Sequence, residues 1–417
     1  NGARVGTEAT WAPQASVGAF VEMGSAHAPA GKSGVAQLVE RLAFRGTANR
    51  SPFRLSREGE AIGATLTAQA SREQLALALD VPASNVADAV EILADCVANP
   101  RYQQWMVDEE VQKLQEAADA QADNPHGLLM EAANVVAYQG GLSHPLVAPK
   151  DQAAGLTADD CEAFHRANCT GGRVVLAAAG ADHQEVVGVA AELLQGLPEG
   201  GAPKVPFTYL GGDHRQNTGG ELVHALLGYE FAGGWRDVKG SVVMTVLQML
   251  MGGGGSFSAG GPGKGMHSRL YRRVLNNCPW VTNFTAFSSL YNDTGIVGIV
   301  GSADAAKGGD LVGLMSKELE AVASGGTTDE ELERAKASAV ASIWMNLESK
   351  PIVCEDIGRQ LLTYGKRTSG ADFAAEIAKV SKADITKAVT ALLKSTPTLV
   401  SCGDTSTVPR FDSVAKR

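Results

Sequence analysis

Apolar positions along the chain follow two periods, and the order of these periods occurs twice. Near the start, Val17–Ser25 alternates like a strand that runs into a turn, and Val35–Leu42 has the pattern of an apolar helix. The second half repeats this pair with a strand-like run at Leu227–Trp235 and an apolar helix at Val242–Met251. The spacing indicates an internal repeat of roughly 220 residues, far longer than the repeat of a solenoid.

The remaining elements of the two copies also correspond. Each copy continues with two strands, a helix, further long helices and a buried strand that stops at a glycine. They are predicted at Ile62–Thr67, Leu75–Val81, Val86–Cys96 and Val174–Gly180 in the first copy, and at Val281–Phe287, Ile296–Val300, Leu311–Val322 and Thr398–Gly403 in the second. Carboxylates are favoured at a helix N-terminus, so Asp108–Val111 and Asp329–Leu332 are predicted helix starts.

Each half therefore has the order β-α-β-β-α-α-β, which predicts an α/β fold of the α+β type. We expect two homologous domains of about 200 residues, each with a mixed, mainly antiparallel sheet covered by helices. The domains are predicted at residues 1–196 and 207–417, joined by a linker at 197–206 that is rich in Pro and Gly. Two such halves would face each other across a chamber, a common place for ligands. The repeat argues against the alternative, a single doubly wound domain.

Charge, hydropathy and cysteine usage argue against some kinds of partner and site. The formal net charge of −10 disfavours nucleic acid and suits a basic partner, although solubility alone also explains it. No apolar run reaches the roughly 18–20 residues of a membrane span, so no span is predicted. The six cysteines form no C-x-x-C pair. Cys161, His165 and Cys169 fall short of a zinc ligand set, and structural thiols are the expectation.

Four segments carry recognisable motifs: Gly34–Thr47, Gly252–Leu270, Met345–Ser349 and Glu355–Arg359. They resemble the mitochondrial processing peptidase family, which also contains pitrilysin, insulin-degrading enzyme and the core proteins of respiratory complex III. The resemblance covers nearly the whole chain, and the last three segments look like the α subunit, especially that of plants and algae. The resemblance implies two homologous α/β domains around a chamber, in agreement with the repeat.

Active members of this family carry H-x-x-E-H on a helix, where the two His bind zinc and the Glu polarises the metal-bound water. The aligned residues here are Gln37, Glu40 and Arg41, and the family's third ligand, a Glu, falls within Glu109–Glu116. Arginine is a permanent cation with no lone pair to offer a metal. We therefore expect no catalytic residue and no metal or other cofactor on this chain, with zinc on a β-type partner. Glu40 and Arg41 are expected to form an ion pair.

The segment 252–265 contains eight glycines. A phosphate-binding Walker loop is disfavoured, because Ser258 replaces its first Gly and Gly265 follows Lys264 where Ser or Thr is needed. A flexible linker is a second interpretation. The resemblance implies a third, that the segment contacts the presequence, since glycine backbone can approach an extended peptide closely. The candidate substrate-binding residues are Gly252, Gly253, Gly254, Gly255, Ser256, Phe257, Gly260, Gly261, Gly263, Lys264 and Gly265.

Charged residues near these motifs have simpler explanations. The basic group His267, Arg269, Arg272 and Arg273 should not anchor presequences that are themselves rich in arginine, so helix packing or a subunit contact is expected. The acidic residues Glu109, Glu110, Glu355 and Asp356 could receive a basic peptide, or could be solvated helix faces.

The resemblance implies a non-catalytic α-type subunit of a mitochondrial processing peptidase that recognises presequences and presents them to a β-type subunit. It also implies integration in respiratory complex III at the matrix face of the inner membrane, with other complex III subunits as partners. The alternative is a purely structural core subunit of complex III (ubiquinol–cytochrome c reductase). A self-sufficient peptidase would need a metal site that these residues do not provide.

Overall fold

The computed structural model describes residues 1–201, 204–255 and 266–415, which form two compact units. Unit 1 comprises Asn1–Ala120, Gly140–Phe207 and Met345–Thr368, and unit 2 comprises Gln121–Gln139, Thr208–Trp344 and Ser369–Arg417. Each unit thus contains a segment from the opposite half of the sequence. The predicted domains 1–196 and 207–417 divide the chain by its internal repeat, and that division stays a prediction.

Unit 1 is built on a five-stranded sheet with the order β1-β6-β2-β4-β3. Its strands are β1 (Arg4–Glu8), β2 (Gln14–Val21), β3 (Thr65–Ala70), β4 (Leu75–Pro82) and β6 (Val174–Ala179). Strands β1 and β6 are parallel, and the other pairs are antiparallel. Every residue of β6 is buried because both faces of the sheet are covered there, whereas the edge strand β3 alternates between exposed and half-buried positions.

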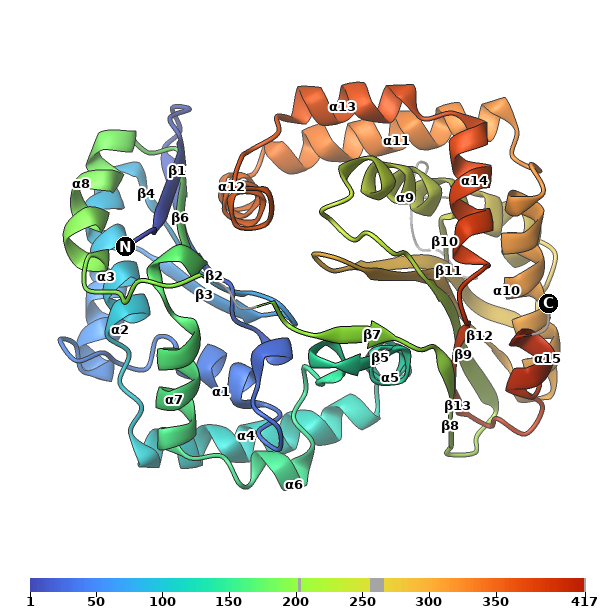
Figure 1. Cartoon of the computed structure of the whole chain (residues 1–417), viewed down its shortest axis with the longest axis horizontal. Helices are drawn as coiled ribbons and strands as arrows, with labels where there is room; N and C mark the ends of the chain where they lie inside the picture. Colours follow the sequence, from blue (N-terminus) through green and yellow to red (C-terminus); the bar gives the residue numbers. More distant parts are fainter. Residues whose placement is uncertain (202–203, 256–265, 416–417) are drawn as a thin grey trace. The chain divides into compact units, whose positions relative to one another are not determined.

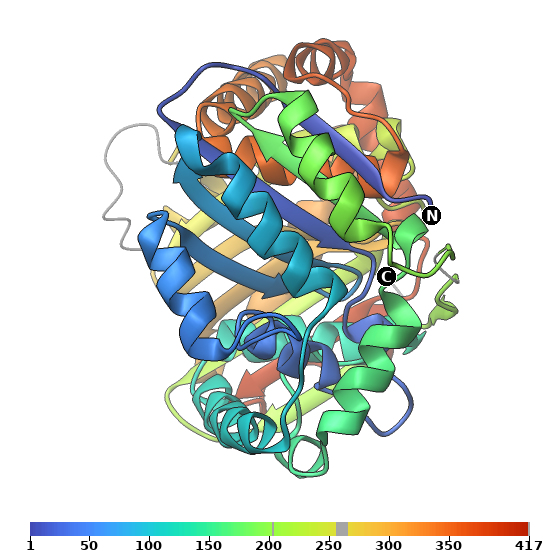
Figure 2. The ribbon, with the colours of Figure 1, turned by 90° about the vertical axis from the view of Figure 1, so that its left-hand side faces the viewer.

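One face of this sheet carries α3 (Val86–Ala98) and α8 (His183–Leu194), which lie side by side (Figure 2). The opposite face carries α12 (Lys350–Tyr364), which comes from the second half of the sequence (Figure 1). The unit's other helices are α1 (Val35–Leu42), α2 (Pro52–Ala61), α4 (Gln104–Ala122), α6 (Lys150–Ala153) and α7 (Ala158–Asn168). The last two residues of α4 belong to unit 2.

Unit 2 repeats this plan with a six-stranded sheet of order β10-β11-β12-β9-β13-β8. Its strands are β8 (Gly212–Asn217), β9 (Leu222–Glu230), β10 (Gly253–Gly255), β11 (Val281–Leu290), β12 (Gly295–Asp304) and β13 (Thr398–Gly403). Only the β13–β8 pair is parallel among the described pairs of this sheet. Without β10, the order matches that of unit 1 strand for strand, so the predicted repeat and mainly antiparallel sheets are confirmed.

The helices of unit 2 follow the same plan. α9 (Val238–Met251) and α10 (Gly308–Ala323) contact the sheet, while α5 (Pro125–Ala137), from the first half of the sequence, packs on β13, β9 and β8. The remaining helices are α11 (Asp329–Leu347), α13 (Gly370–Lys379), α14 (Lys382–Leu392), α15 (Phe411–Ala415) and the short π-helix η5 (Tyr271–Leu275). Strands β5 (Tyr138–Gly140) and β7 (Phe207–Tyr209) form a small sheet where the chain passes from one unit to the other.

The predicted starts at Leu227, Val242 and Leu311 are too late, because β9, α9 and α10 begin at Leu222, Val238 and Gly308. Two further boundaries are wrong for identifiable reasons. The predicted strand Ile62–Thr67 begins too early, because Ile62 caps the C-terminus of α2 and β3 starts at Thr65. The predicted helix start at Asp108 lies inside α4, which begins one turn earlier at Gln104 and thereby buries Met106 and Val107. The acidic start at Asp329 is confirmed as the beginning of α11.

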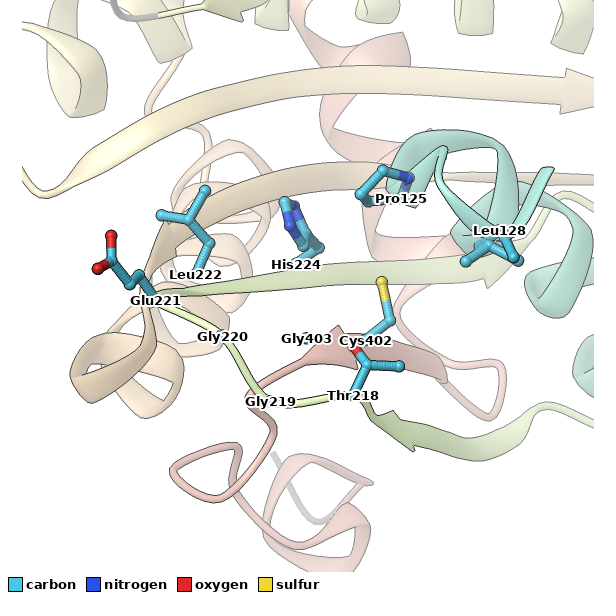
Figure 3. A pocket seen from close by; sticks show the side chains of 11 residues that line it. Pro125, Leu128, Thr218, Gly219, Gly220, Glu221, Leu222, His224, Cys402 and Gly403 are labelled. Carbon is cyan, nitrogen blue, oxygen red and sulfur yellow. The ribbon is translucent and has the colours of Figure 1, made fainter. Parts of the chain in front are cut away.

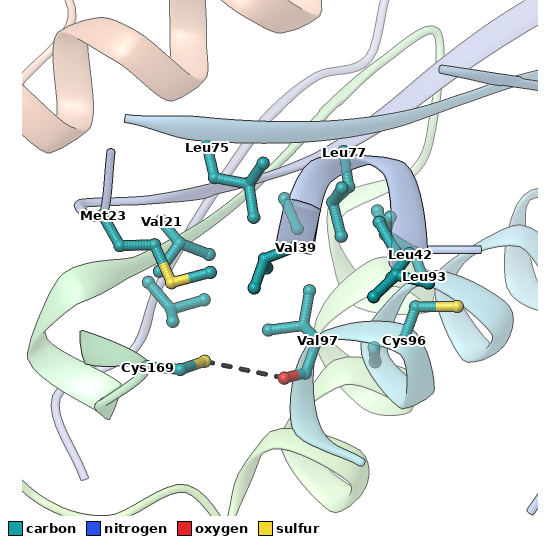
Figure 4. Close-up of a cluster of buried hydrophobic side chains, with 14 of the residues drawn as sticks. Val21, Met23, Val39, Leu42, Leu75, Leu77, Leu93, Cys96, Val97 and Cys169 are labelled. Atoms are coloured by element: carbon teal, nitrogen blue, oxygen red, sulfur yellow. Dashed lines mark hydrogen bonds between the residues drawn. The ribbon is translucent and has the colours of Figure 1, made fainter. Parts of the chain in front are cut away.

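The core of unit 1 joins α1 to the sheet and to α3. Val39 and Leu42 pack with Leu75 and Leu77 of β4, and the Cys169 thiol donates a hydrogen bond of 3.5 Å to the Val97 carbonyl (Figure 4). Burial raises the pKa of the Cys96, Cys161 and Cys169 thiols to about 12, which keeps them protonated. All six cysteines lie in the described ranges and are free, as expected of structural thiols.

The fit of α12 on its sheet depends on small residues. Its buried residues Val353 and Ile357 share an apolar cluster with Phe20, and a Cβ added at Gly358 would lie 2.0 Å from the Phe20 ring. Arg367, just beyond the helix, pairs with Glu8 of β1 at 2.6 Å. A helix contributed by the other half of the sequence is thus fastened to unit 1 by packing and by charge.

We predict that Gly358→Ala lowers the stability of unit 1. The added methyl group must displace the buried Phe20 ring, and overpacking of this kind costs about 1–3 kcal/mol. The measurement is the urea unfolding midpoint. The matched control is Gly313→Ala in α10, where a Cβ meets nothing within 4 Å and the helix should gain about 0.5–1 kcal/mol. Equal midpoints for the two variants would contradict this packing.

Candidate functional site

Helix α1 presents the three residues aligned with the family's zinc motif. Its apolar residues, including Val35, Leu38 and Leu42, are buried in unit 1, which places Gln37, Glu40 and Arg41 on the remaining face. Positions 37 and 41 are one helical turn apart and share a side of the helix. The helical spacing predicted for the motif is therefore present, but Gln37 and Arg41 stand where active members of the family have His.

Two of these side chains accept hydrogen bonds from backbone N–H groups. The amide oxygen of Gln37 accepts a hydrogen bond of 3.1 Å from Ala148 N–H, and a Glu40 carboxylate oxygen accepts one of 3.0 Å from Ala70 N–H at the end of the edge strand β3. Burial raises the pKa of Glu40 above its ordinary value, although the Ala70 N–H and the Arg41 charge act in the opposite direction. Both side chains thus help to hold α1 against neighbouring segments.

Arg41 pairs with Glu110 of α4, so the expected ion pair with Glu40 is wrong. Its Nη1 lies 3.7 Å from Glu110 Oε2. Glu110 is buried and also lies 2.8 Å from Lys113 Nζ and 3.4 Å from Arg45 Nη2. Glu40 points towards the Ala70 N–H instead of Arg41. Glu110 is a buried carboxylate, and it needs several charged partners, Arg41 among them, to offset its loss of hydration.

Glu109 extends this cluster, because it pairs with Arg45 at 2.7 Å and with Lys113 at 3.1 Å. Three cations (Arg41, Arg45 and Lys113) thus surround two carboxylates. These guanidinium and ammonium groups more than neutralise the two carboxylates, and Glu110 is the residue of the window Glu109–Glu116 that pairs with Arg41.

This set of side chains does not fit zinc. Zinc prefers thiolate, imidazole and carboxylate donors, whereas this face offers an amide oxygen, a carboxylate already bound by an N–H, and a guanidinium. Within residues 1–201, 204–255 and 266–415, no group of three or more His, Cys, Asp or Glu side chains could hold a metal ion. His165 and Cys169 both contact the Val97 carbonyl.

The glycine-rich candidate site is only partly described. Gly252 follows α9, and Gly253, Gly254 and Gly255 form β10, which pairs with β11. The other candidate residues (Ser256, Phe257, Gly260, Gly261, Gly263, Lys264 and Gly265) lie outside the described residues. Their role in presequence binding stays a prediction.

Within the basic group after this segment, Arg269 serves packing, one of the two uses expected for the group, whereas His267, Arg272 and Arg273 are exposed. The Arg269 side chain is 1% exposed and pairs with Glu318 at 3.3 Å and with Glu331 at 3.1 Å. Arg273 also pairs with Glu318, at 2.9 Å. The acidic residues of the family motif near α12 are similarly paired: Glu355 with Arg359 at 2.7 Å, and Asp356 with Arg367 at 3.0 Å.

Unit 2 also contains a cavity that sequence reasoning missed. It has a volume of about 380 Å³ and is lined by residues from α5, from the turn before β9 and from the end of β13 (Figure 3). His224 and Cys402 are cross-strand neighbours in its wall, and His224 Nδ1 lies 2.7 Å from the Ser302 hydroxyl. Only the register of β9 with β13 brings these two residues together, and no spacing in the sequence signals it.

We predict that Glu40→Gln raises stability at neutral pH. A raised pKa in the folded chain means that ionisation of Glu40 costs stability as the pH rises through its unfolded and then its folded pKa. Glutamine avoids this cost and can still accept the Ala70 N–H. The thermal midpoint of the variant should exceed that of the unsubstituted chain at about pH 7.5, and the difference should shrink towards the ordinary Glu pKa of about 4.3.

The control for this prediction is Glu192→Gln, which replaces an exposed carboxylate on α8 and should give a pH-independent difference. A midpoint of Glu40→Gln below that of the unsubstituted chain at neutral pH would show that the carboxylate stabilises the fold.

The chain is similar in sequence and in fold to proteins of a known family. Residues 4–150 match the family model described as Insulinase (Peptidase family M16), and residues 155–339 match the one described as Peptidase M16 inactive domain. A solved chain of complex III2 from Candida albicans superposes with a TM-score of 0.83 at 19% identity, covering 99% of this chain and 96% of that one. That similarity supports the fold.

Curated relatives match the chain over almost its whole length. A probable mitochondrial-processing peptidase subunit alpha-2 of Arabidopsis thaliana is 44% identical, covering 100% of this chain and 84% of its own. The subunit alpha of Solanum tuberosum is also 44% identical, covering 100% and 83%, and that of Homo sapiens is 32% identical, covering 99% and 82%. The chain therefore belongs to peptidase family M16, the insulinase family, and is similar over its full length to mitochondrial-processing peptidase alpha subunits.

Proposed function

We propose that this chain is the non-catalytic, α-type subunit of a mitochondrial processing peptidase, which recognises presequences and presents them to a zinc-bearing β-type subunit. The observation that carries the proposal is Arg41 at the second metal-ligand position, paired with Glu110. The 44% identity to plant alpha subunits over the whole chain supports the same role.

Catalysis must then come from the partner. Glu40 holds the position of the general base, but its carboxylate binds the Ala70 N–H and has no metal-bound water to polarise. This chain needs no metal of its own in the proposal, and its fold is held by hydrogen bonds and ion pairs at that position.

The proposed location is the mitochondrial matrix and the matrix face of the inner membrane, in association with complex III. Among the helices of the described residues, none is long and apolar enough to cross a membrane. Fractionation of mitochondria tests the location, because the chain should co-migrate with a β-type subunit and with cytochromes. If the chain co-migrates with cytochromes in a fraction that cleaves no presequence, the purely structural core role is favoured.

The first test of the proposed function is reconstitution. The isolated chain should leave a presequence peptide uncleaved, the β-type subunit alone should cleave it slowly, and the mixture should cleave it efficiently. Efficient cleavage by the β-type subunit alone would contradict a presenting role for this chain.

We predict that deletion of residues 256–264 lowers presequence cleavage by the reconstituted pair at least about tenfold, corresponding to about 1.4 kcal/mol of lost transition-state stabilisation. The deletion keeps Gly252–Gly255, so β10 and its pairing with β11 remain. Co-purification of the two subunits is the control for assembly. An unchanged cleavage rate in an assembled pair would show that the segment has no part in handling the presequence.

A further inference from the structure

The cavity of about 380 Å³ in unit 2 has a thiol and an imidazole in its wall (Figure 3). Cys402 of β13 is directly opposite His224 of β9 in an antiparallel pair. Directly opposed residues project on the same face of a sheet, with Cβ atoms about 4.5–5.5 Å apart. Pro125 and Leu128 of α5 line the same cavity. The thiol and the imidazole are therefore neighbours on the face that carries α5.

The His224 ring has a defined orientation in this wall. Its Nδ1 lies 2.7 Å from the Ser302 hydroxyl of β12, on the side of β9 away from β13. A Cβ added at Gly403 of β13 would lie 3.5 Å from His224 Cδ2, so the ring edge with Cδ2 and Nε2 faces β13. If Nδ1–H donates to the hydroxyl, Nε2 keeps its lone pair, as in histidines that bind metals. Nε2 forms no hydrogen bond with the part of the chain that the structure describes.

The Cys402 thiol is also available. It is free, and it forms no hydrogen bond among the described residues. Unit 1 offers a comparison, because Cys169 and His165 also line a common cavity. There, the thiol and the imidazole both contact the Val97 carbonyl, at 3.5 Å and 2.9 Å. The pair in unit 2 thus differs in having both donor atoms without such a contact.

The chemistry of the two donors selects the kind of ligand. Thiolate sulfur and neutral imidazole nitrogen are donors that suit Cu(I). Cu(I) is stable with two donors in a nearly linear arrangement, whereas zinc in proteins takes four ligands, at least three of them side chains. Within residues 1–201, 204–255 and 266–415, no group of three or more His, Cys, Asp or Glu side chains could hold a metal ion. A soft monovalent ion therefore fits this pair, and zinc does not.

We propose that Cys402 and His224 form a site for Cu(I), bound by the Cys402 sulfur and by Nε2 of His224. The thiol proton passes to solvent as the sulfur–copper bond forms, and the oxidation state of copper does not change. A cavity of this size also admits a third donor, such as a small thiol that delivers the ion. The site lies in unit 2 and makes no use of α1, so it does not depend on the proposed function.

An anaerobic titration with Cu(I) tests the site, in competition with the coloured Cu(I) chelator bicinchoninate. The protein is the Cys278→Ser variant, because Cys278 is the cysteine that is not buried among the six, all of which the structure describes. We expect one Cu(I) per chain that the chelator does not remove. X-ray absorption should show one sulfur and one imidazole nitrogen as its protein ligands. Zinc should be lost on dialysis, because two protein donors are too few for it.

Three variants of the site give the assignment. Cys402→Ser and His224→Gln should each abolish the retention of Cu(I) against the chelator. Ser302→Ala should weaken binding about tenfold, since the hydrogen-bond partner of a ligating histidine typically contributes about 10–100-fold in metal affinity. The thermal midpoint without copper shows whether each variant folds. If Cys402→Ser does not fold, His224→Gln and the X-ray absorption spectrum decide.

Two matched controls should bind Cu(I) like the Cys278→Ser chain. Cys169→Ser removes the thiol of the comparison pair, and His214→Gln removes an exposed imidazole from the neighbouring strand β8. The proposal is overturned if Cys402→Ser and His224→Gln both retain Cu(I), or if Cys169→Ser loses it. It is also overturned if the Cys278→Ser chain yields all of its copper to the chelator.

Discussion

The proposed role of this chain depends on the guanidinium of Arg41, at the position that the family resemblance aligns with a metal ligand. Helix α1 keeps the geometry in which positions 37 and 41 share one side, but Arg41 brings a permanent positive charge to that side and directs it at the buried Glu110. Gln37 and Glu40 are held by the backbone N–H groups of Ala148 and Ala70. Positive side chains and hydrogen bonds thus hold the elements around α1, and the carboxylates of this cluster already have cationic partners.

The surrounding fold depends on exchange between the two halves of the sequence. Each sheet has one face covered by helices of its own half and the other covered by one helix from the opposite half: α12 in unit 1 and α5 in unit 2. The apolar cluster of Phe20, Val175 and Ile357 exists only when both halves are present. Neither unit can therefore complete its core from a contiguous half of the chain, which makes the intact polypeptide the folding entity.

Periodicity predicted the repeated strands and most helices, since alternation and apolar runs are properties of neighbouring residues. The predicted strand at Val281 and the predicted helix at Val86 begin where β11 and α3 begin. The exchanged helices could not be predicted in this way, because Gly358 meets Phe20 only after the chain has crossed between units. Packing was one of the two uses expected for Arg269, but its burial between Glu318 and Glu331 could not be predicted, because both partners are far away in the sequence.

The helix that carries Gln37, Glu40 and Arg41 was predictable from its apolar pattern, whereas their assignment to a zinc motif came from the resemblance and stays a prediction. The choice of Glu110 over Glu40 as the partner of Arg41 was not predictable, because it depends on where α4 and β3 lie in space. The hydrogen bond from Gly253 N–H to the Ser268 hydroxyl could not be predicted, because a serine after a glycine-rich run has no pattern of its own and the two residues are 15 positions apart.

Zinc content tests the proposed function most directly: the purified chain, alone and mixed with the proposed β-type subunit, is dialysed against zinc and measured by elemental analysis. Zinc should be retained only by the complex, because a guanidinium at the second ligand position repels a divalent ion. Stoichiometric zinc on the chain alone, with presequence cleavage that a chelator abolishes and added metal restores, would contradict the proposed function.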